Sequence, residues 1–386
     1  MARRSPAAAH HPTTGERTVL DDLVIALTYY TPYVSGLTNF ARDVAEGLAE
    51  RGKRVRVITT RHDPSLPHEE TINGVRVSRA PVLARFGKGV ISPAFATMVR
   101  EASANARVLN LHLPMLEAGP VAALAKCPVV VTYHCDVSLP PGLVNSVQGK
   151  VIDASSRLAM RRAAAVVATS EDYARESRLW PSIQPHLATV PPPCRPVPAG
   201  VPRFRDGDGL HVGFLGRIVE EKGVEHLVDG FRALDDPSAR LLIGGDFGNV
   251  AGGSVIARVR AHVDGDPRIK LLGFVPDEDL GDFYASLDVF ALPSVNAFEA
   301  FGIVQVVAML AGVPVLASDL PGVRIPVRET GFGLIVPPGD AAAITSGLRS
   351  LRDEPPVSDG TAAVKFSVPA VLDAFEALFE KHDRML

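Results

Sequence analysis

Residues 298–318 read FEAFGIVQVVAMLAGVPVLAS, and this stretch decides the fold class of the chain. It follows an apolar strand and begins as a loop with a single acid, Glu299. Gly302 then opens an apolar helix, and Gly312 closes that helix just before the next strand. This order is typical of a parallel α/β sheet, which binds its ligands at the carboxyl ends of the strands. The stretch therefore predicts Glu299 at such an edge, beside a helix N-terminus that attracts anions and hydroxyl groups.

Two less specific interpretations of this stretch have to be weighed. Residues 300–317 are almost entirely apolar, which is long enough to suggest a membrane span. Gln305 and the Gly-Val-Pro run at 312–314 favour a buried helix followed by a strand instead. Glu299 taken alone is equally consistent with an ordinary N-terminal helix cap, so a functional assignment needs further motifs.

The composition is that of a globular protein with two domains. A length of 386 residues exceeds what one hydrophobic core usually holds, and 46% of the residues are hydrophobic. The formal net charge of −3 gives no electrostatic basis for binding nucleic acid. Residues 1–18 are polar and lack an apolar core, which predicts a disordered tail and no signal peptide. Three cysteines without a Cys-x-x-Cys pair favour reduced thiols and a cytoplasmic protein.

Strand-like apolar runs alternate with helical patterns along the chain, which predicts βαβ units and parallel sheets. Prolines at positions 191–193, 196, 198 and 202 break this alternation, because such a run extends neither a helix nor a central strand. We therefore divide the chain into a tail (1–18), an N-terminal domain (19–194), a Pro-rich linker (195–208), a C-terminal domain (209–368) and a final helical segment (369–386).

The stretch around Glu299 resembles the donor-sugar loop of the family 4 glycosyltransferases, which have the GT-B fold and retain the anomeric configuration. In that family an acid, then Phe-Gly, then a second acid eight residues after the first precede Gly-x-Pro-Val. Here Val307 stands where the second acid is expected. The resemblance covers roughly residues 20–382. It implies an α/β protein with two doubly wound, Rossmann-like domains facing a central cleft, the first on the acceptor side and the second binding the nucleotide-sugar. The last helix of such proteins crosses back to the first domain.

A pair of cations follows another predicted strand end. Gly216 and Arg217 form a tight turn after apolar residues, and Lys222 precedes the next helix. Two fixed cations suit a pyrophosphate, because they stabilise the charge of a departing diphosphate without reorganisation. Solvated ion pairs with the neighbouring glutamates are the alternative. The family has Gly-Arg and Lys-Gly at this spacing, so the resemblance implies that these residues hold the donor diphosphate.

His134 follows a further strand end and resembles the family histidine that faces the donor sugar near its reacting carbon. A histidine in this position is more often a satisfied structural residue, which is the alternative. The resemblance implies that Asp136 holds the His134 ring or meets the acceptor. It also makes His112, at the end of the preceding strand, a candidate on the acceptor side of the cleft. His134 and Cys135 lack a second pair of ligands at metal spacing, so we predict no metal site.

The loop after the first strand carries Ser35 and Gly36 where the family usually has two glycines. Gly36 still allows close approach of a ligand to the backbone. Ser35 contributes a hydroxyl to that ligand or, in the alternative, caps the next helix. Tyr33 in the same loop is a candidate on the acceptor side. The resemblance implies further donor contacts from Phe274, Val275, Phe301, Gly302, Ile303 and Val307.

Signatures of other enzyme classes are missing from the sequence. It contains no GxGxxG after a strand, no Walker A loop and no GxSxG elbow. Asp-x-Asp strings begin at Asp206, Asp264 and Asp277, but they lie in turns or at a helix start. Metal-dependent glycosyltransferases carry this motif at the end of an apolar strand. We therefore predict no metal and no bound cofactor, with the nucleotide-sugar as co-substrate.

Val307 leaves three interpretations of the donor site open. Losing a charged acceptor costs about 1.5–3 kcal/mol in donor binding. The protein would bind its donor weakly, hold the donor differently, or bind sugars or nucleotides without catalysis. We predict a retaining, metal-independent transfer of a sugar from a nucleotide-activated donor, with a non-catalytic binding subunit of the GT-B fold as the alternative. The acceptor is not identified. One helical stretch carries Lys150, Arg157, Arg161 and Arg162, which keeps a membrane-linked acceptor and a peripheral membrane location open, although this pattern is usually a solvated face.

Overall fold

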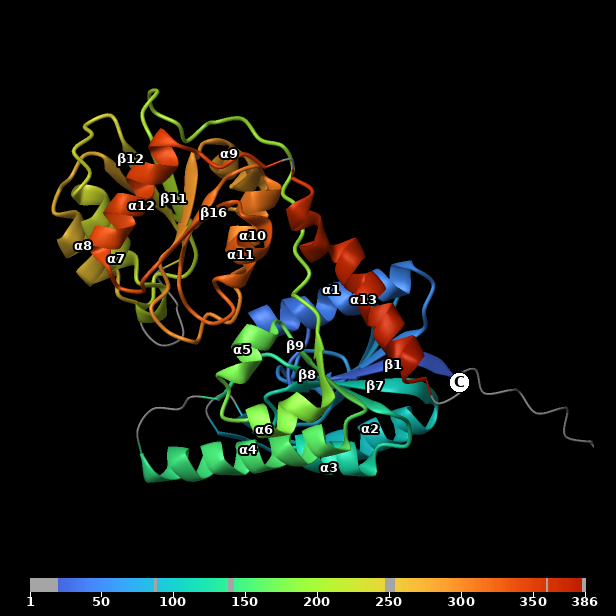
Figure 1. Ribbon diagram of the computed structural model, residues 1–386. Coiled ribbons are helices and arrows are strands. Elements are labelled where there is room, and N and C mark those ends of the chain that lie inside the picture. Colours follow the sequence, from blue (N-terminus) through green and yellow to red (C-terminus); the bar gives the residue numbers. More distant parts are fainter. Residues whose placement is uncertain (1–19, 87–88, 138–141, 247–253, 359, 384–386) are drawn as a thin grey trace, which may run out of the picture.

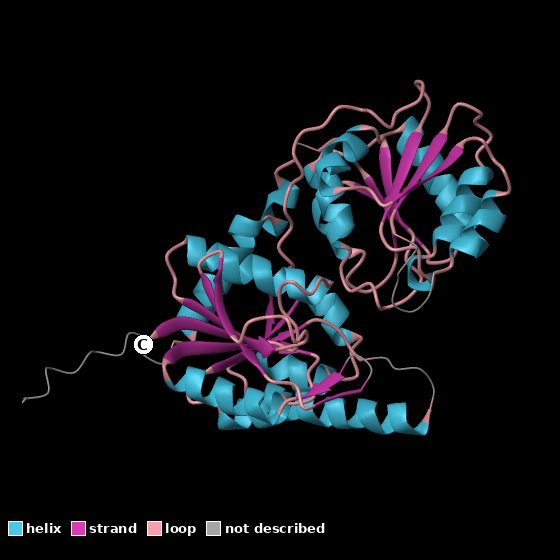
Figure 2. Cartoon of the chain, turned by 180° about the vertical axis from the view of Figure 1, so that it is seen from behind, coloured by secondary structure: helices cyan, strands magenta, loops and turns pink. Residues whose placement is uncertain are grey.

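Two α/β units make up the protein in the computed structural model, which describes residues 20–86, 89–137, 142–246, 254–358 and 360–383 (Figure 1). The predicted tail, 1–18, lies outside these residues. Each unit is built around one sheet, and helices cover both faces of that sheet (Figure 2). The predicted fold class, with two doubly wound Rossmann-like units, is therefore confirmed.

The first sheet has the strand order β10-β9-β8-β7-β1-β2-β4-β3, and only β3 runs antiparallel to its neighbour. Its central strands are continuous apolar runs, as expected where helices bury both faces of a parallel sheet. The strands are β1 (Asp21–Ala26), β2 (Val55–Thr60), β3 (Glu69–Ile72), β4 (Val75–Ala80), β7 (Ala106–Leu113), β8 (Val129–Tyr133), β9 (Ala165–Ala168) and β10 (Leu187–Thr189). A separate hairpin consists of β5 (Ala84–Phe86) and β6 (Gly89–Ile91).

The longest helices of the first unit are α1 and α4. Ser35 caps α1, because its side chain accepts a hydrogen bond from the Thr38 amide at 3.1 Å. Helix α1 packs its apolar face on the core that contains β1 and β2, whereas α4 packs against α3. The helices are α1 (Gly36–Glu50), α2 (Pro93–Ala104), α3 (Ala118–Leu124), α4 (Leu143–Arg162), α5 (Glu171–Arg175) and α6 (Trp180–Ile183).

The second sheet is entirely parallel, with the order β13-β12-β11-β14-β15-β16. Its strands are β11 (His211–Leu215), β12 (Arg240–Gly244), β13 (Ile269–Gly273), β14 (Val289–Leu292), β15 (Val315–Ser318) and β16 (Gly333–Val336). Its helices are α7 (Val224–Arg232), α8 (Ile256–Val263), α9 (Leu280–Ala285), α10 (Ile303–Leu310), α11 (Ile325–Thr330) and α12 (Ala341–Asp353). Short 3₁₀ turns occupy Gln184–His186, Glu220–Lys222, Asp277–Asp279 and Ala362–Phe366.

The stretch at 298–318 folds as a helix and a strand. Helix α10 begins after Gly302 and is followed by Gly312 in the left-handed region (φ +81°), and β15 then enters the sheet. Met309 of α10 is buried in the core of the second unit, and Val306 is buried in a small cluster with Phe301 and Phe366. The prediction of a buried helix plus strand is therefore confirmed, and no helix among the described residues is long and apolar enough to cross a bilayer.

Two segments connect the units. Residues 190–210 belong to neither sheet, a longer irregular stretch than the predicted 195–208 because the prolines begin at position 191. The second segment leads into α13 (Val368–Lys381), which returns to the first unit and packs against α1 (Figure 1). Phe375 and Phe379 of this helix join the first unit's core, and Arg51 of that unit pairs with Asp373 at 2.7 Å.

Candidate active site

Two topological switch points position the loops that carry the predicted site residues. In the first sheet β1 lies between β2 and β7, and in the second sheet β11 lies between β12 and β14. Ligands of doubly wound sheets bind beside such points, at the carboxyl ends of the strands. The segments after β1, β8, β11 and β14 hold Ser35, His134, Lys222 and Glu299 respectively. The topology thus assigns all four residues to ligand-binding edges.

The structure brings Lys222 and Glu299 together across the second switch point. The Lys222 ammonium donates a hydrogen bond to Oε2 of Glu299, and the two side chains are only 15% and 14% exposed. Oε1 of Glu299 accepts a hydrogen bond from the Gly302 amide at 3.1 Å, at the start of α10. Gly302 is required there, because its φ is +78° and a Cβ would lie 2.3 Å from the Leu292 side chain. A fixed cation and a fixed acid therefore meet at one helix N-terminus.

Arg217 lies on the same loop but has a different partner. Its guanidinium is about half exposed and donates to the Glu221 carboxylate at 3.1 Å. The loop itself is held to the Glu299 loop, because the Val295 amide donates to the Glu221 carbonyl at 3.0 Å. At Gly216 (φ +157°) a Cβ would lie 3.9 Å from Cε of Lys222, so this lysine crosses over the glycine turn. The ion pair that was the alternative for Arg217 is thus present, alongside a loop geometry that holds Lys222 in place.

His134 stands at the end of a chain of three hydrogen-bonded side chains. Its Nε2 lies 2.9 Å from Nδ1 of His112, and Nε2 of His112 lies 2.8 Å from Oδ1 of Asn110. The Asn110 amide nitrogen donates to the Val130 carbonyl at 3.1 Å and to Thr132 Oγ1 at 2.8 Å. Because the Val130 carbonyl can only accept, it fixes the orientation of the amide and turns Oδ1 toward His112.

This orientation sets the protonation of both rings. Oδ1 of Asn110 can only accept, so Nε2 of His112 carries the proton and Nδ1 of His112 is an acceptor. Nε2 of His134 must then donate, which leaves Nδ1 of His134 unprotonated. Burial lowers the pKa of His134 to about 3, and burial together with the neighbouring His134 lowers the pKa of His112 well below its usual value. The ring of Phe40 meets His134 edge-on at 4.9 Å between ring centroids. Both imidazoles are therefore neutral near pH 7.

Sequence reasoning missed Asn110. The signal for it is a polar residue two positions before His112 in an otherwise apolar strand, because residues i and i+2 of a strand share a face. Both side chains are almost fully buried in β7, at 0% and 1% exposure. A buried asparagine beside a buried histidine is usually part of a satisfied polar network.

Asp136 does not hold the ring of His134; that role belongs to His112. Oδ1 of Asp136 accepts hydrogen bonds at 2.8 Å from the Tyr133 hydroxyl and from Ser177, and Oδ2 accepts one from the Arg178 amide at 3.1 Å. Of the two roles expected for Asp136, a place on the acceptor side therefore stays a prediction.

The loop after β1 presents an aromatic pair beside the glycine. The ring of Tyr33 stacks on Tyr29 at 4.6 Å, and His62 meets both rings edge-on. A Cβ at Gly36 would meet nothing within 4 Å, so open space adjoins the start of α1. Because Ser35 caps α1, the alternative considered for this serine is realised.

The two residues predicted to hold the nucleotide base differ sharply in their exposure to solvent. Phe274 is 71% exposed, whereas Val275 is 7% exposed and buried in the second core cluster of this unit. Val307 is partly buried and packs against the same cluster. Val307, which stands where the second acid was expected, therefore packs beside the apolar group that includes Val275.

The segment expected to position the sugar is anchored by the buried ring of Phe301. The Phe301 ring is 3% exposed, and it packs in a small cluster that contains Cys194 of the connecting segment. Ile303 packs against the same cluster. Gly302 is also buried, its amide donates to Glu299, and the Phe301 carbonyl accepts a hydrogen bond from the Gln305 side chain, so the main chain of this turn is bonded within the protein.

A pocket of about 300 Å³ lies between the two units, directly beside the Glu299 loop. The first unit contributes Tyr133 and Asp136, and the loop of the second unit contributes Asn296 and Phe298. Phe298 is 56% exposed. Two of its lining residues, Tyr133 and Phe298, directly precede His134 and Glu299 in the sequence.

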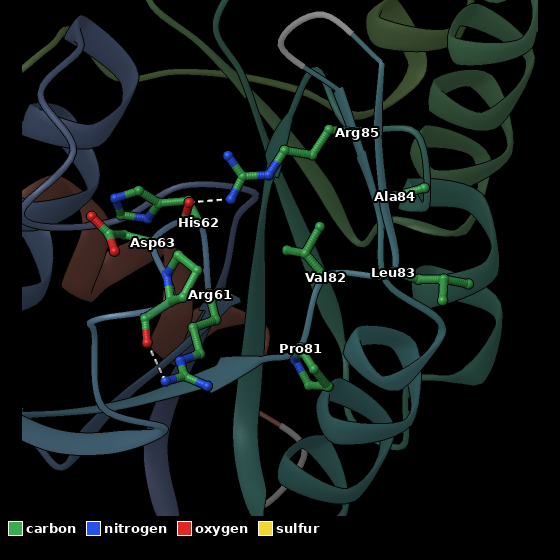
Figure 3. Close-up of a pocket in the computed structure, with 9 residues that line it drawn as sticks. Arg61, His62, Asp63, Pro81, Val82, Leu83, Ala84 and Arg85 are labelled. Atoms are coloured by element: carbon green, nitrogen blue, oxygen red, sulfur yellow. Dashed lines mark hydrogen bonds between the residues drawn. The ribbon is translucent and has the colours of Figure 1, made fainter.

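A second pocket, of about 750 Å³, lies wholly in the first unit, beyond the carboxyl end of β2 (Figure 3). Arg61 and Arg85 extend toward it, and their guanidinium groups are held by the main-chain carbonyls of Pro64 and His62 respectively. Among the residues that the structure describes, neither arginine has a carboxylate partner. Asp63 also lines this pocket, so two arginines and one carboxylate leave its lining with a net positive charge.

Contacts between the units close the cleft beside the first of these pockets. Asp172 of α5 accepts hydrogen bonds from Nε and Nη2 of Arg324 at 2.9 and 2.7 Å and from the Gly322 amide at 2.9 Å. The Tyr173 hydroxyl donates to the Ala297 carbonyl at 3.2 Å. These contacts fix the Glu299 loop relative to the first unit.

No group of three or more His, Cys, Asp or Glu side chains in the described part of the chain is placed to hold a metal ion. The cation that contacts Glu299 is the Lys222 ammonium.

Family models match both halves of the chain. One described as "Glycosyl transferase 4-like domain" matches residues 35–193, and one described as "Glycosyl transferases group 1" matches residues 209–354. A 2-deoxystreptamine glucosyltransferase of Streptomyces kanamyceticus is 30% identical over 81% of this chain and 88% of that protein. A phosphatidyl-myo-inositol mannosyltransferase of Mycobacterium leprae is 30% identical over 82% of this chain and 83% of that protein.

The fold has close counterparts among solved structures. The structure of Anabaena HepE in complex with UDP matches with a TM-score of 0.68 at 17% identity, covering 93% of this chain and 100% of that chain. The fold and the matches together define a GT-B protein that transfers sugars. The chain belongs to the group 1 glycosyl transferases, with a glycosyl transferase 4-like N-terminal half.

Proposed function

We propose that this enzyme transfers a sugar from a nucleotide diphosphate donor, with retention of configuration and without a metal ion. The observation that carries the proposal is the contact between Lys222 and Glu299 at the second switch point, beside the N-terminus of α10. A cation and an acid in fixed positions suit the diphosphate and the hydroxyl groups of one activated sugar. The UDP bound to the similarly folded Anabaena protein supports a nucleotide as the donor's leaving part.

Each group at the site has one task in this proposal. Glu299, held in place by the Gly302 amide, orients the sugar, while Lys222 and Arg217 balance the charge of the departing diphosphate. The bond from the anomeric carbon to the diphosphate oxygen breaks, and a new bond forms from that carbon to the acceptor oxygen. The proton of the acceptor hydroxyl passes to the released diphosphate. His134 is neutral and supplies an unprotonated Nδ1, so it acts as a hydrogen-bond acceptor and supplies no proton.

The acceptor hydroxyl in this proposal belongs to a cyclitol. The two relatives are named for 2-deoxystreptamine and for phosphatidyl-myo-inositol, and both compounds contain a six-membered carbon ring with hydroxyl groups. A shared ring with different substituents is consistent with a family that varies its acceptor pocket on a constant scaffold.

A thermal-shift panel of UDP-, GDP- and ADP-sugars tests the donor, because a ligand that binds only the folded state raises the melting temperature. One nucleotide class should stabilise the wild type, and Lys222→Ala should lose that stabilisation. Lys270→Ala should keep it, because Lys270 pairs with Asp206 away from the Glu299 loop. Transfer should survive EDTA. Activity that disappears with EDTA and returns with Mn²⁺ or Mg²⁺ would refute the metal-free mechanism.

A second candidate function is a binding subunit without turnover, and Val307 is the observation that favours it. An apolar side chain at this position cannot accept the hydrogen bonds of a ribose. Stabilisation by a nucleotide-sugar, with neither hydrolysis nor transfer to any cyclitol, would support this candidate over the enzyme.

A further inference from the structure

The pocket of about 300 Å³ between the units has a composition that indicates its ligand. Six of its lining side chains come from both units: Tyr133, Asp136, Tyr173 and Glu176 from the first, and Asn296 and Phe298 from the second. This volume is at the lower end of the range for small-molecule sites, about 300–1,000 Å³, and suits a single ring.

The pocket lies where an acceptor would meet the donor sugar. Phe298 immediately precedes Glu299, and Asp136 follows His134 by two residues. The hydrogen bond from Tyr173 to the Ala297 carbonyl joins the two walls of the pocket. A molecule in this space would lie beside the Glu299 loop, because Asn296, Ala297 and Phe298 line the pocket.

The charges around the pocket are mostly negative. Asp136 and Glu176 line it, and none of its lining residues is a lysine or arginine. The nearest cation to Asp136 is Arg178 at 3.6 Å, but that guanidinium donates to Asp153 at 2.6 and 2.9 Å. Glu176 is exposed and has no cationic partner among the described residues. The pocket therefore has an uncompensated negative charge.

The aromatic side chains that line the pocket also favour a positively charged ligand. Tyr133, Tyr173 and Phe298 line the pocket, and aromatic rings attract cations as well as the apolar faces of sugars. An ammonium group would be favoured by both the carboxylates and the rings, whereas a phosphate would be repelled by both.

We propose that this pocket binds the acceptor ring and that the ring carries an amino group, as in an aminocyclitol. The proposal rests on the proposed glycosyl transfer, and it selects between cyclitols of opposite charge. A phosphorylated cyclitol would instead suit the basic pocket at Arg61 and Arg85 (Figure 3).

Three probes with the same myo ring test the charge preference: 1-amino-1-deoxy-myo-inositol, myo-inositol and myo-inositol 1-phosphate. Binding to the full-length protein is measured by calorimetry and by ligand-observed saturation-transfer NMR. The amine should bind about 5- to 20-fold more tightly than the neutral ring, the range expected for a partly exposed charged contact. Glu176→Gln should remove most of this preference, and Arg85→Gln, in the other pocket, should leave it unchanged.

Three results would overturn the proposal: tightest binding of the phosphate, equal binding of the amine and the neutral ring, or an unchanged amine preference in Glu176→Gln. The melting temperature of each variant checks that it is folded. The nucleotide-sugar panel is run on the same preparations. Absence of stabilisation by every nucleotide-sugar would refute the proposed function, whereas the order of the three ring probes reports on the acceptor pocket alone.

Discussion

The direction of the hydrogen-bond chain through Asn110 should be reversible by one substitution. In Asn110→Leu, a near-isosteric change, Nε2–H of His112 loses its acceptor. Leaving a buried donor unsatisfied costs about 1–3 kcal/mol, which corresponds to a factor of about 5 to 150. His112 should therefore move its proton to Nδ1 and donate to His134. Nδ1 of His134 then becomes protonated and can no longer accept a hydrogen bond.

Long-range ¹H–¹⁵N NMR of histidine-labelled protein measures this directly, because protonated and unprotonated ring nitrogens have distinct shifts. The wild type should show protonated Nε2 in both rings, and Asn110→Leu should show protonated Nδ1. Thr132→Val is the matched control, because the Val130 carbonyl still orients the amide in that variant. Transfer should decline in Asn110→Leu and persist in Thr132→Val. A wild-type protein with Nδ1 of His134 protonated would refute the reasoning.

Further predictions concern other parts of the molecule. Lys222→Ala should lower transfer about 10²- to 10³-fold in steady-state assays, the scale of one lost charge stabiliser, and near-native rates would exclude Lys222 from the donor site. If α10 faces a ribose, Val307→Glu should raise nucleotide-sugar affinity about 10- to 100-fold, because a carboxylate there gains one or two charged hydrogen bonds. Calorimetry measures this affinity, and a folded variant without any gain would contradict that placement. The free energy of unfolding should decrease as pH falls from about 6.5 toward about 3, because the unfolded chain takes up a proton that His134 does not accept in the folded state. Urea titrations should show a weaker pH dependence in His134→Gln. Asp172→Asn should weaken the contact with Arg324 by about 1–2 kcal/mol, and small-angle scattering should then show a larger radius of gyration.

The local features of the second unit could be predicted from sequence because each depends on neighbouring residues. Glu299, Gly302 and Gly312 lie within fourteen positions, and the order of loop, helix and strand follows from helix-start and helix-stop signals. The break at the prolines likewise needs only local information. Two motifs at strand ends predicted that Lys222 and Glu299 lie at ligand-binding edges, although neither motif determines that the two side chains touch.

The parts that escaped prediction depend on which strands are neighbours. Asn110 meets Thr132 because β7 pairs with β8, and no local pattern states that pairing. The contact of Asp172 with Arg324 joins residues on different units, so it depends on how the units are placed. The pocket that Glu176 lines is formed by both units, so the charge of its lining depends on the same placement. Sequence patterns therefore predicted the elements and their order, whereas the partners of the candidate site residues required the three-dimensional arrangement.

The chain crosses between the units twice, and the crossings run side by side. The Cys194 amide donates to the Phe366 carbonyl at 2.9 Å, and Cys194 forms a parallel bridge with Ser367. A single connecting strand would allow the units to swivel in any direction, whereas two strands bonded to each other can bend together but resist twisting. Opening of the cleft should therefore follow one hinge axis near Cys194, which returns the Glu299 loop to the same position against the first unit each time the cleft closes.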